Sequence, residues 1–376
     1  MNDTHQRRIL ALQSALDGAG IACAVLSRAQ HLTYYAGQQL GGLPLLLLVS
    51  PRRCALVAPA GMGESGFETF PYTSYDIHNG WSVADASAAA LGQALSALCP
   101  PQAVRENRAV LGLEVPFLPA NLLQAALAYS GEQRELAGLL WGLRKIRDAG
   151  ELEQIRLNQA GNDLAFARLR DQIQAVGETR AGVSEFELWA TMYRTLCETA
   201  GEPVALQADL GVGLRGVVGD AKPGPFQLEA GDAVFADLYT SVRGYTADTT
   251  RTFIAGQATP RQREVHTALL EALAAGEARL RPGERACDVD AAVRGCIARS
   301  GFGANFPHHS GHASGLFHQD RPYFIPADPT PLEAGMVVTL EPGIYIPAWG
   351  GMRLEHNYLI EPSGPPLILD QYPLDL

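Results

Sequence analysis

The stretch FADLYTSVRGYTADTTRTF, residues 235–253, has two runs of apolar and β-branched residues around a short segment that contains a glycine. β-branched and aromatic residues favour strands, and glycine is common in tight hairpin turns because it adopts a positive φ without strain. The stretch therefore predicts a β-hairpin. A turn centred between Val242 and Arg243 would place Asp237 opposite Asp248, with both side chains on one face of the sheet.

A second pair of segments has the same character: TLEPGIYIP at 339–347 and GGMRLEHNYLI at 350–360. Glu341 and Glu355 lie at equal distances on either side of Ala348, so a turn centred on that residue places the two acids opposite each other. Directly opposed residues of a hairpin point to one face of the sheet. The sequence thus predicts two hairpins that each present two carboxylates.

A histidine lies between the hairpins, in HHSGHASGLFHQDRP at 308–322, where it follows a glycine and precedes small residues. Four buried carboxylates would repel one another and lose their hydration, and cations between them remove both costs. Four carboxylates with one imidazole suit Mn²⁺, Co²⁺, Fe²⁺ or Zn²⁺, and they are enough for two ions. The alternative is that each acid lies at the solvent-exposed end of a strand. The residues around the acids are apolar or β-branched, which favours burial instead. We therefore expect a metal site formed by Asp237, Asp248, His312, Glu341 and Glu355.

These segments resemble the pita-bread metallopeptidase family, which includes proline dipeptidases, Xaa-Pro aminopeptidases, creatinase and methionine aminopeptidases. The family motifs run in the order D-x(10)-D-x-T-R-T, G-H-x-x-G-L, E-P-G and G-x-R-x-E, and the chain has all four in that order. The resemblance also extends to the creatinase-type N-terminal domain, for example at HLTYYAG, residues 31–37. It implies an α/β N-terminal domain over 1–142, followed over 143–376 by an α+β pita-bread catalytic domain.

The resemblance also implies a chemistry for the five residues. Asp237 would chelate one divalent ion, His312 and Glu341 would hold a second, and Asp248 and Glu355 would bridge the two, with Mn²⁺ preferred over Co²⁺, Zn²⁺ or Fe²⁺. Such a centre cleaves an amide bond by a metal-bound hydroxide, as Xaa-Pro aminopeptidases and proline dipeptidases do. In this scheme Glu341 shuttles the proton, and the subunits form homodimers.

Three further residues are candidates for catalysis. Arg353 lies two positions before the last expected ligand, on the same face of a strand, where a guanidinium can orient a carboxylate or steady a charged intermediate. His308 resembles a recurrent family position, and His318 is expected in the substrate pocket. Arg251 and His356 lie on the other faces of their strands, so we expect structural roles for them.

Two positions depart from the peptidase pattern and mark candidate pocket residues. Gln319 stands where proline-specific members carry a second histidine, with His318 one position early, and Asp220 stands where they carry an upstream histidine. A glutamine donates hydrogen bonds but does not titrate near neutral pH, and an ionised aspartate only accepts. The sequence therefore predicts weak cleavage of neutral Xaa-Pro dipeptides and better cleavage of substrates with a positive charge near the scissile bond.

These departures leave two alternatives to an Xaa-Pro peptidase. One is a creatinase-like hydrolase of a small non-peptide amide or amidine, because creatinase has the same fold with a different substrate. The other is a non-catalytic binding module of this fold, which the complete set of five ligand positions disfavours. If the protein is an enzyme, the expected partner is a small peptide or small amide substrate.

The composition excludes several classes of protein. The 376 residues are 47% hydrophobic and 18% charged, which is typical of a globular chain with two domains. The net charge of −11 argues against nucleic acid or an anionic membrane surface as a partner. The six cysteines form no CxxC pair and the first ten residues contain no apolar run, so we expect a reduced, cytoplasmic protein.

Helix and strand signals complete the prediction. Strands alternate with helices over the first 135 residues, which predicts a mixed sheet. Further along, Ser184 with Glu187 and Thr259 with Gln262 have the spacing of capping boxes and predict that helices begin there. We expect these helices to pack outside a curved antiparallel sheet that carries the acidic residues.

Overall fold

The computed structural model describes residues 2–38, 43–63, 65–74, 83–99, 109–130, 132–179 and 182–376. The chain divides into two compact units, Met1–Arg144 and Lys145–Leu376, whereas the boundary expected from the sequence lies between residues 142 and 143. Among the helices within the described ranges, none combines the length and the apolar character that crossing a membrane requires.

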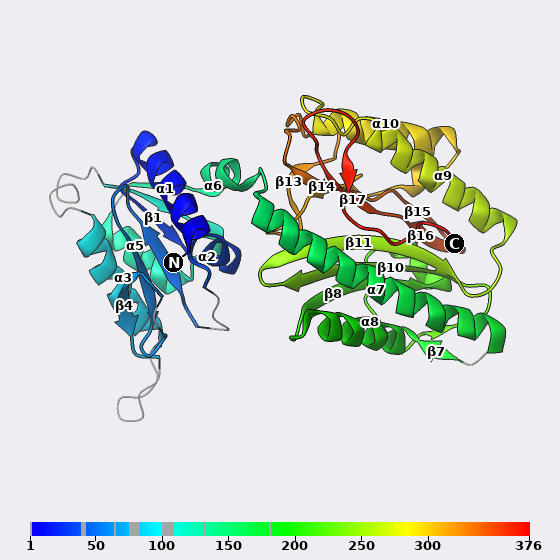
Figure 1. Ribbon diagram of the computed structural model, residues 1–376, viewed down its shortest axis with the longest axis horizontal. Coiled ribbons are helices and arrows are strands. Elements are labelled where there is room, and N and C mark those ends of the chain that lie inside the picture. The colour runs from blue at the N-terminus through cyan, green and yellow to red at the C-terminus, as the bar shows by residue number, and fades with distance from the viewer. Residues whose placement is uncertain are drawn as a thin grey trace. The chain divides into compact units, whose positions relative to one another are not determined.

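A six-stranded mixed sheet forms the centre of the first unit, in the order β4-β3-β2-β1-β5-β6 (Figure 1). Its strands are β1 Cys23–Leu26, β2 Leu46–Val49, β3 Cys54–Pro59, β4 Glu68–Tyr72, β5 Val110–Leu113 and β6 Glu132–Glu135. β1 pairs antiparallel with β2 and parallel with β5. Every residue of these three strands is buried, so both faces are covered and the sequences are unbroken apolar runs.

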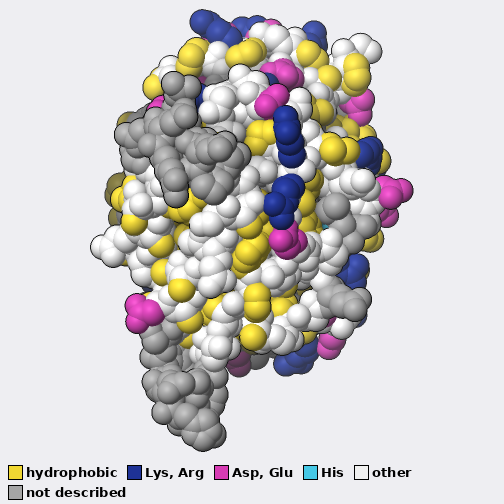
Figure 2. All heavy atoms as spheres, turned by 90° about the vertical axis from the view of Figure 1, so that its left-hand side faces the viewer, with side chains coloured by type: hydrophobic (Ala, Val, Ile, Leu, Met, Phe, Trp, Pro, Cys, Tyr) yellow, Lys and Arg dark blue, Asp and Glu magenta, His cyan; other side chains and the backbone are white. Residues whose placement is uncertain are grey.

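Helices cover the sheet of the first unit. They are α1 Asp3–Gly18, α2 Ala29–Ala36, α3 Val83–Leu98, α5 Ala120–Tyr129 and α6 Ala137–Arg144. Helices α3 and α5 share one core with the sheet. It contains Leu91 and Leu95 of α3, Leu122 of α5, Val25 of β1 and Leu48 of β2. On the face that Figure 2 shows, the coloured acidic and basic side chains lie interspersed among hydrophobic and uncharged ones.

The second unit has antiparallel sheets between two pairs of helices (Figure 1). One sheet has the order β11-β10-β8, another β13-β12-β14-β17-β18, and β15 pairs with β16. The larger strands are β8 Ala205–Val212, β10 Ala233–Val242, β11 Tyr245–Ile254, β13 Asp320–Tyr323, β14 Val337–Leu340, β15 Gly343–Ile346, β16 Gly350–Arg353 and β17 His356–Leu359. The short strands are β7 Val183–Ser184, β9 Gln227–Leu228, β12 His312–Ala313 and β18 Leu367–Ile368.

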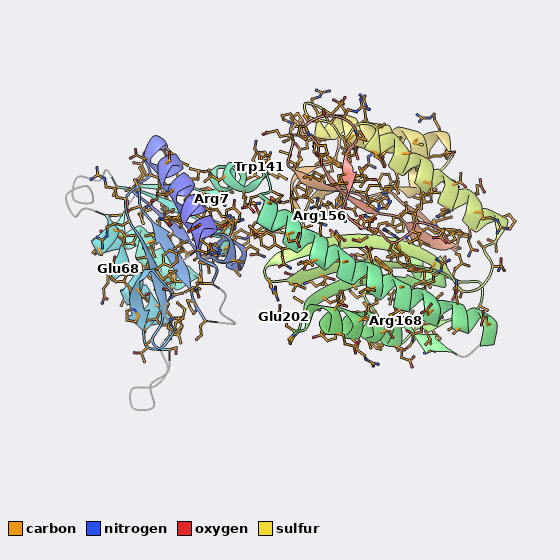
Figure 3. All side chains as sticks on the ribbon, in the orientation of Figure 1. Arg7, Glu68, Trp141, Arg156, Arg168 and Glu202 are labelled. Atoms are coloured by element: carbon orange, nitrogen blue, oxygen red, sulfur yellow. The ribbon has the colours of Figure 1, made fainter. Side chains whose placement is uncertain are left out.

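Four helices flank these sheets: α7 Ala149–Thr179, α8 Glu185–Ala200, α9 Pro260–Glu277 and α10 Ala286–Arg299. Helix α7 packs on β11 with Phe166 and Leu169 buried, while Arg156 and Arg168 lie on its exposed face (Figure 3). Both predicted capping boxes are present at the starts of α8 and α9. The expected arrangement of helices outside antiparallel strands is therefore confirmed.

Candidate metal centre

The turn of the β10–β11 hairpin is centred one residue later in the sequence than predicted. Its turn consists of Arg243 and Gly244, whose φ angles are 52° and 82°, and Val242 pairs directly with Tyr245. Positive φ at both central residues is typical of the two-residue turns whose twist matches that of the flanking strands. The preference of Gly244 for such a conformation moves the turn centre to the bond between it and Arg243.

This shift corrects the predicted pairing of the two aspartates. Asp237 lies opposite Thr250, and Asp248 lies opposite Tyr239, so the two acids are diagonal neighbours rather than directly opposed. When the centre of the turn moves by one residue, the residue opposite each position changes by two. Because side chains alternate between the two faces of a strand, a change of two positions keeps every side chain on its original face. The carboxylates of Asp237 and Asp248 therefore still meet on one side of the sheet.

The second hairpin has the predicted centre. Ala348 lies in its turn with a φ of 62°, Gly343 pairs with Arg353, and Leu340 pairs with His356 further along the same register. Glu341 and Glu355 fall between these two ladders, at opposed positions. The backbone register of this hairpin therefore agrees with the predicted opposition of the two acids.

A close backbone approach fixes His312 in β12. Gly311 has a φ of 155°, and a Cβ atom at this position would lie 2.1 Å from the carbonyl oxygen of Thr339, so only glycine fits. The His312 backbone N–H donates to the Thr339 hydroxyl at 3.2 Å, and the ring Nδ1–H donates to the Ala313 carbonyl at 3.0 Å. The glycine before the histidine is therefore a requirement of the packing around β12 and β14.

The structure brings all five predicted ligand residues together, and all five are buried. Single carboxylate oxygens of Asp237, Asp248 and Glu355 lie within 4.8 Å of one another. His312 Nε2 lies 3.3 Å from Asp248 Oδ2 and 3.3 Å from Glu341 Oε1. Nδ1 of this ring donates to a backbone carbonyl, so Nε2 is the atom that faces the two carboxylates. Burial alone would lower the pKa of His312, but Asp248 and Glu341 raise it to about 10, so the ring holds a proton between the two acids. A divalent cation between these atoms would take the place of that proton.

The protonation of the acids also fits a cation at this position. Burial raises the pKa of Glu355 well above its ordinary value, and the neighbouring Asp248 raises it further. Burial raises the pKa of Asp237 to about 7, although the Arg353 guanidinium opposes this. Asp237 Oδ1 and Glu355 Oε1 are buried and have no hydrogen-bond partner among the described residues. Unpaired buried oxygens are costly, and metal coordination removes this cost.

Hydrogen bonds behind the acids hold them in place. Arg353 donates through Nη2 to Asp237 Oδ2 at 2.5 Å and through Nε to the Thr250 hydroxyl at 3.1 Å. That hydroxyl in turn donates to Glu355 Oε2 at 3.0 Å. Arg353 thus orients carboxylates at the cluster, as its position in the sequence predicts. Partners of this kind fix the geometry of metal ligands in proteins.

The two residues expected to have structural roles lie on the other side. Arg251 is buried and donates to Asp370 Oδ2 at 2.6 Å and to the Tyr372 carbonyl. His356 Nδ1 lies 2.6 Å from the same Asp370 oxygen. Both side chains therefore fasten the C-terminal segment to the back of the sheet, and their predicted structural roles agree with these contacts.

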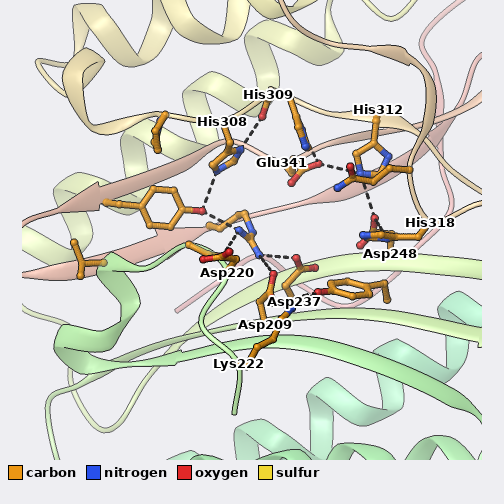
Figure 4. A pocket seen from close by; sticks show the side chains of 17 residues that line it. Asp209, Asp220, Lys222, Asp237, Asp248, His308, His309, His312, His318 and Glu341 are labelled. Carbon is orange, nitrogen blue, oxygen red and sulfur yellow. Dashed lines mark hydrogen bonds and ion pairs between the residues drawn. The ribbon is translucent and has the colours of Figure 1, made fainter. Parts of the chain in front are cut away.

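A cavity of about 470 Å³ opens beside the cluster (Figure 4). Its lining contains the predicted pocket residues Asp220, Gln319, His308 and His318. Asp220 and Gln319 are exposed, and neither has a hydrogen bond or an ion pair with another described residue. Their catalytic and substrate roles remain predictions, but all four side chains lie where they can meet a substrate.

His308 has both ring nitrogens engaged. Nδ1 donates to the His309 carbonyl at 2.8 Å, and Nε2 accepts from the Tyr345 hydroxyl at 2.9 Å. Arg353 Nη1 donates to the same hydroxyl at 3.0 Å. Burial lowers the pKa of His308 to about 4, so the ring is neutral at physiological pH. His308 therefore acts on a substrate only if one of these hydrogen bonds is exchanged.

Several lining residues were not predicted from the sequence: Asp209, Lys222, Tyr239, His309 and Tyr345. The place of Tyr239 beside the cluster could have been predicted, because it lies two positions after Asp237 and a strand returns to the same face every second residue. The sequence contains no such indication for Asp209, since this residue reaches the cluster only through the pairing of β8 with β10. Lys222 is one of two lysines in the chain, which is a weak signal at best.

The geometry agrees with comparisons to known proteins. The model of metallopeptidase family M24 matches residues 153–362, more than half of the chain. The chain is 34% identical over 231 residues to a putative dipeptidase, YkvY, of Bacillus subtilis (strain 168), covering 60% of this chain and 63% of that protein. It is also 34% identical over 233 residues to an Xaa-Pro dipeptidase of Pyrococcus furiosus, covering 62% of this chain and 65% of that protein.

The chain thus spans less than two thirds of the length of these curated relatives. A solved structure of an Xaa-Pro dipeptidase from Bacillus anthracis matches at a TM-score of 0.81, with 25% identity over 99% of each chain. The arrangement of sheets and helices in the second unit is therefore the pita-bread fold. The chain belongs to metallopeptidase family M24.

Proposed function

We propose that the protein is a metal-dependent hydrolase of amide bonds, and in particular an Xaa-Pro peptidase of the aminopeptidase P or proline dipeptidase type. One observation carries the proposal: four buried carboxylates and one imidazole converge beside a cavity large enough for a small peptide. The relatives described as Xaa-Pro dipeptidases support the same substrate class.

The five converging residues would hold two divalent ions. We assign Asp237 to one ion and His312 with Glu341 to the other, with Asp248 and Glu355 shared. Ions bound there polarise an amide carbonyl and lower the pKa of a water molecule. Carboxylates suit the shared positions because each has two oxygens.

Glu341 is the residue that we assign to proton transfer. Burial alone would raise its pKa, but His309 and His312 hold the pKa of Glu341 well below its ordinary value, so the carboxylate is ionised at neutral pH. It therefore accepts a proton from the attacking water and passes it to the leaving nitrogen. Arg353 donates a hydrogen bond to Asp237 and so orients the Asp237 carboxylate.

Turnover by protein of known metal content tests this proposal. Protein purified without chelator should contain up to two divalent ions, and Mn²⁺-loaded protein should hydrolyse dipeptides and tripeptides with proline in the second position. Glu355→Ala should lose both ions and the activity. Full activity in metal-free protein, or a stable acyl-enzyme trapped during turnover, contradicts the proposal. Bound metal without turnover on any amide favours a non-catalytic binding module.

A second function is favoured by the open side of the cavity. Asp220 is exposed there and has no partner among the described residues, and Gln319 offers an amide instead of an imidazole. An ionised carboxylate at this place favours a cationic group in the substrate, such as an amine or amidine. A creatinase-like hydrolase of a small non-peptide amide would have these needs. A panel that pairs Xaa-Pro peptides with small amides and amidines separates the two functions.

We further propose that the native ion is Mn²⁺ and that the protein is a cytoplasmic homodimer. All six cysteines are free, which suits a reducing compartment. Elemental analysis of protein from its natural host tests the ion, and light scattering tests the dimer. A monomer at micromolar concentration contradicts the proposed assembly.

A further inference from the structure

A stacked pair of rings forms one wall of the cavity. The His318 imidazole lies over the Tyr239 ring, with centroids 4.0 Å apart and planes inclined by 27°. Both residues line the cavity, and they come from different parts of the unit, β10 and the loop before β13. The Tyr239 ring therefore limits where the imidazole of this loop can lie.

The tyrosine is itself fixed at its hydroxyl end. Lys222 Nζ donates to the Tyr239 hydroxyl at 2.8 Å, and that hydroxyl donates to Asp209 Oδ1 at 3.1 Å. Lys222 also bonds Asp209 directly. Tyr239 is 9% exposed, so its ring has little freedom between the strand and these two partners. The support beneath His318 is consequently rigid.

The imidazole on this support is turned towards the reactive groups. His318 Nδ1 lies 3.1 Å from Asp248 Oδ2, and the His318 side chain is 36% exposed. No hydrogen-bond partner of Nε2 is found within the described part of the chain. The ring therefore has one nitrogen facing the carboxylate cluster and one that a substrate can contact. Gln319, next along the chain, is exposed and has no such support.

We propose that Tyr239 is a positioning residue that holds the His318 imidazole in the cavity, where His318 contacts the substrate in place of the imidazole that Gln319 lacks. The proposal rests on the proposed amide hydrolysis for the role of His318. The placement of the ring by Tyr239 does not depend on which amide is cleaved. Lys222 and Asp209 contribute by anchoring the tyrosine.

Kinetics of single and double variants test the coupling. With the amide that wild type cleaves best, His318→Ala should lower kcat by about 10²- to 10³-fold, the usual loss for one donor to a developing charge. Tyr239→Leu should lower kcat by roughly 3- to 10-fold through loss of the ring stack, and Tyr239→Phe by less than about threefold. In the His318→Ala background, Tyr239→Leu should change kcat by less than about twofold, because the imidazole that Tyr239 supports is already absent.

A matched control removes a stacked tyrosine elsewhere in the same unit. Tyr193 stacks on Trp189 in α8 at 5.3 Å, outside the residues that line the cavity. Tyr193→Leu should leave kcat unchanged. The metal content of Tyr239→Leu should equal that of wild type. Three results overturn the proposal: equal losses in Tyr239→Phe and Tyr239→Leu, additive losses in the double variant, or loss of metal in Tyr239→Leu, which would implicate the facing Asp248 instead.

A spectroscopic measurement tests the positioning without any substrate. In metal-free and Zn²⁺-loaded protein with labelled histidine rings, the His318 Cε1–H signal is the one absent from His318→Ala. Stacking on Tyr239 should shift this signal upfield, and the shift should persist in Tyr239→Phe and vanish in Tyr239→Leu. If the upfield shift persists in Tyr239→Phe and vanishes in Tyr239→Leu but no amide is hydrolysed, the proposed function is wrong, whereas the positioning of His318 by Tyr239 is supported. If Tyr239→Leu leaves the signal in place, the positioning is wrong even in an active enzyme.

Discussion

At the scale of single residues, Glu341 illustrates how the surroundings set a side chain's chemistry. His309 Nδ1 and His312 Nε2 each lie 3.3 Å from its Oε1, and both help to hold its pKa well below the ordinary value in spite of burial. Burial raises the pKa of a neighbouring acid, Glu355, well above its ordinary value, and the carboxylates around it raise that pKa further. Two glutamates in one site therefore differ in protonation through their neighbours alone.

This difference leads to the first prediction. Glu341→Gln keeps the size of the side chain but removes the proton acceptor, so kcat should fall by about 10²- to 10⁴-fold while KM changes little. Glu271→Gln is the matched control, because Glu271 is exposed on α9 and does not line the cavity. Steady-state kinetics at fixed Mn²⁺ concentration give both constants. A rise in KM with unchanged kcat would assign Glu341 to binding rather than to proton transfer.

The open side of the cavity leads to the second prediction. Asp220 is exposed and has no partner within the part of the chain that the structure describes, so its charge would oppose a developing oxyanion and favour a cationic substrate group. Asp220→His combined with Gln319→His should raise kcat/KM on neutral Xaa-Pro dipeptides, by up to about 10²-fold if each ring supplies a donor. The preference for substrates with a positive charge near the scissile bond should fall at the same time.

Glu229→His is the control for the change of charge, because Glu229 is exposed and lies outside the cavity lining. It should leave both substrate classes unaffected. If wild type already cleaves neutral Xaa-Pro dipeptides efficiently and the double variant brings no gain, these two positions do not set the specificity. The substrate contact that we propose for His318 would then be sufficient without further imidazoles at positions 220 and 319.

The convergence of the acids was easier to predict from the sequence than the rest of the cavity lining. Asp237 and Asp248 could be found because strand periodicity places them on one face, whatever the details of the turn, and Glu355 could be found from its position relative to the centre of the second hairpin. Asp209 and Lys222 could not, because their positions depend on which strand pairs with β10 and on the course of an irregular loop. Contacts between segments far apart in the chain leave no periodic signal in either segment.

At the scale of elements, a buried ion pair ties α2 to the end of β5 in the first unit. His31 Nδ1 lies 2.5 Å from Glu114 Oε1, and Glu114 Oε2 accepts from the backbone N–H groups of Ser27 and Arg28. Burial alone would raise the pKa of Glu114, but His31 and the two backbone donors lower it below the ordinary value. The ionised carboxylate is therefore favoured in the folded protein.

The third prediction follows from the sign of this shift. An acid whose pKa is lower in the folded state contributes stability above its unfolded pKa of about 4.3, and this contribution is lost as pH falls through the folded pKa. Glu114→Gln should thus lower the free energy of unfolding at neutral pH, on the order of 1–3 kcal/mol. Denaturant unfolding at several pH values should show the difference narrowing below about pH 4.

Glu132→Gln is the control for this prediction. Glu132 is exposed in β6 of the same unit and has no side-chain partner among the described residues. Its replacement should change stability by less than about 0.5 kcal/mol at any of these pH values. A constant difference for Glu114→Gln from neutral to acid pH would mean that packing, and not the charge, sets its contribution.

Elements with regular patterns were also the ones that the sequence predicted. The capping boxes at Ser184 and Thr259 have a local cause, so the predicted helix starts agree with the structure. The edge strand β6 has no such local signal, because all four of its residues are exposed and it forms a strand by pairing with the neighbouring β5. Pairing at an edge is a tertiary effect that the sequence of the strand does not encode.

At the scale of the whole molecule, the metal site carries a cost for stability when no ion is bound. Glu355 has a folded pKa well above its unfolded value because of burial and neighbouring acids. The folded protein therefore keeps a proton that the unfolded chain releases, and this lowers the free energy of unfolding above about pH 4.3. We expect divalent ions to bind only where the second unit is folded, and their binding would reverse this effect.

The last prediction is that metal ions stabilise the second unit selectively. At a free Mn²⁺ concentration 100 times the dissociation constant, one bound ion adds about 2.7 kcal/mol to the free energy of unfolding. Hydrogen exchange should slow in peptides from Lys145–Leu376 and stay unchanged in those from Met1–Arg144. Glu355→Gln should abolish this response, yet its metal-free form should be no less stable than metal-free wild type, because the substitution removes an acid whose ionisation is disfavoured. Equal protection of both units by Mn²⁺, or a response that survives in Glu355→Gln, would mean that the ions bind somewhere other than the five converging residues.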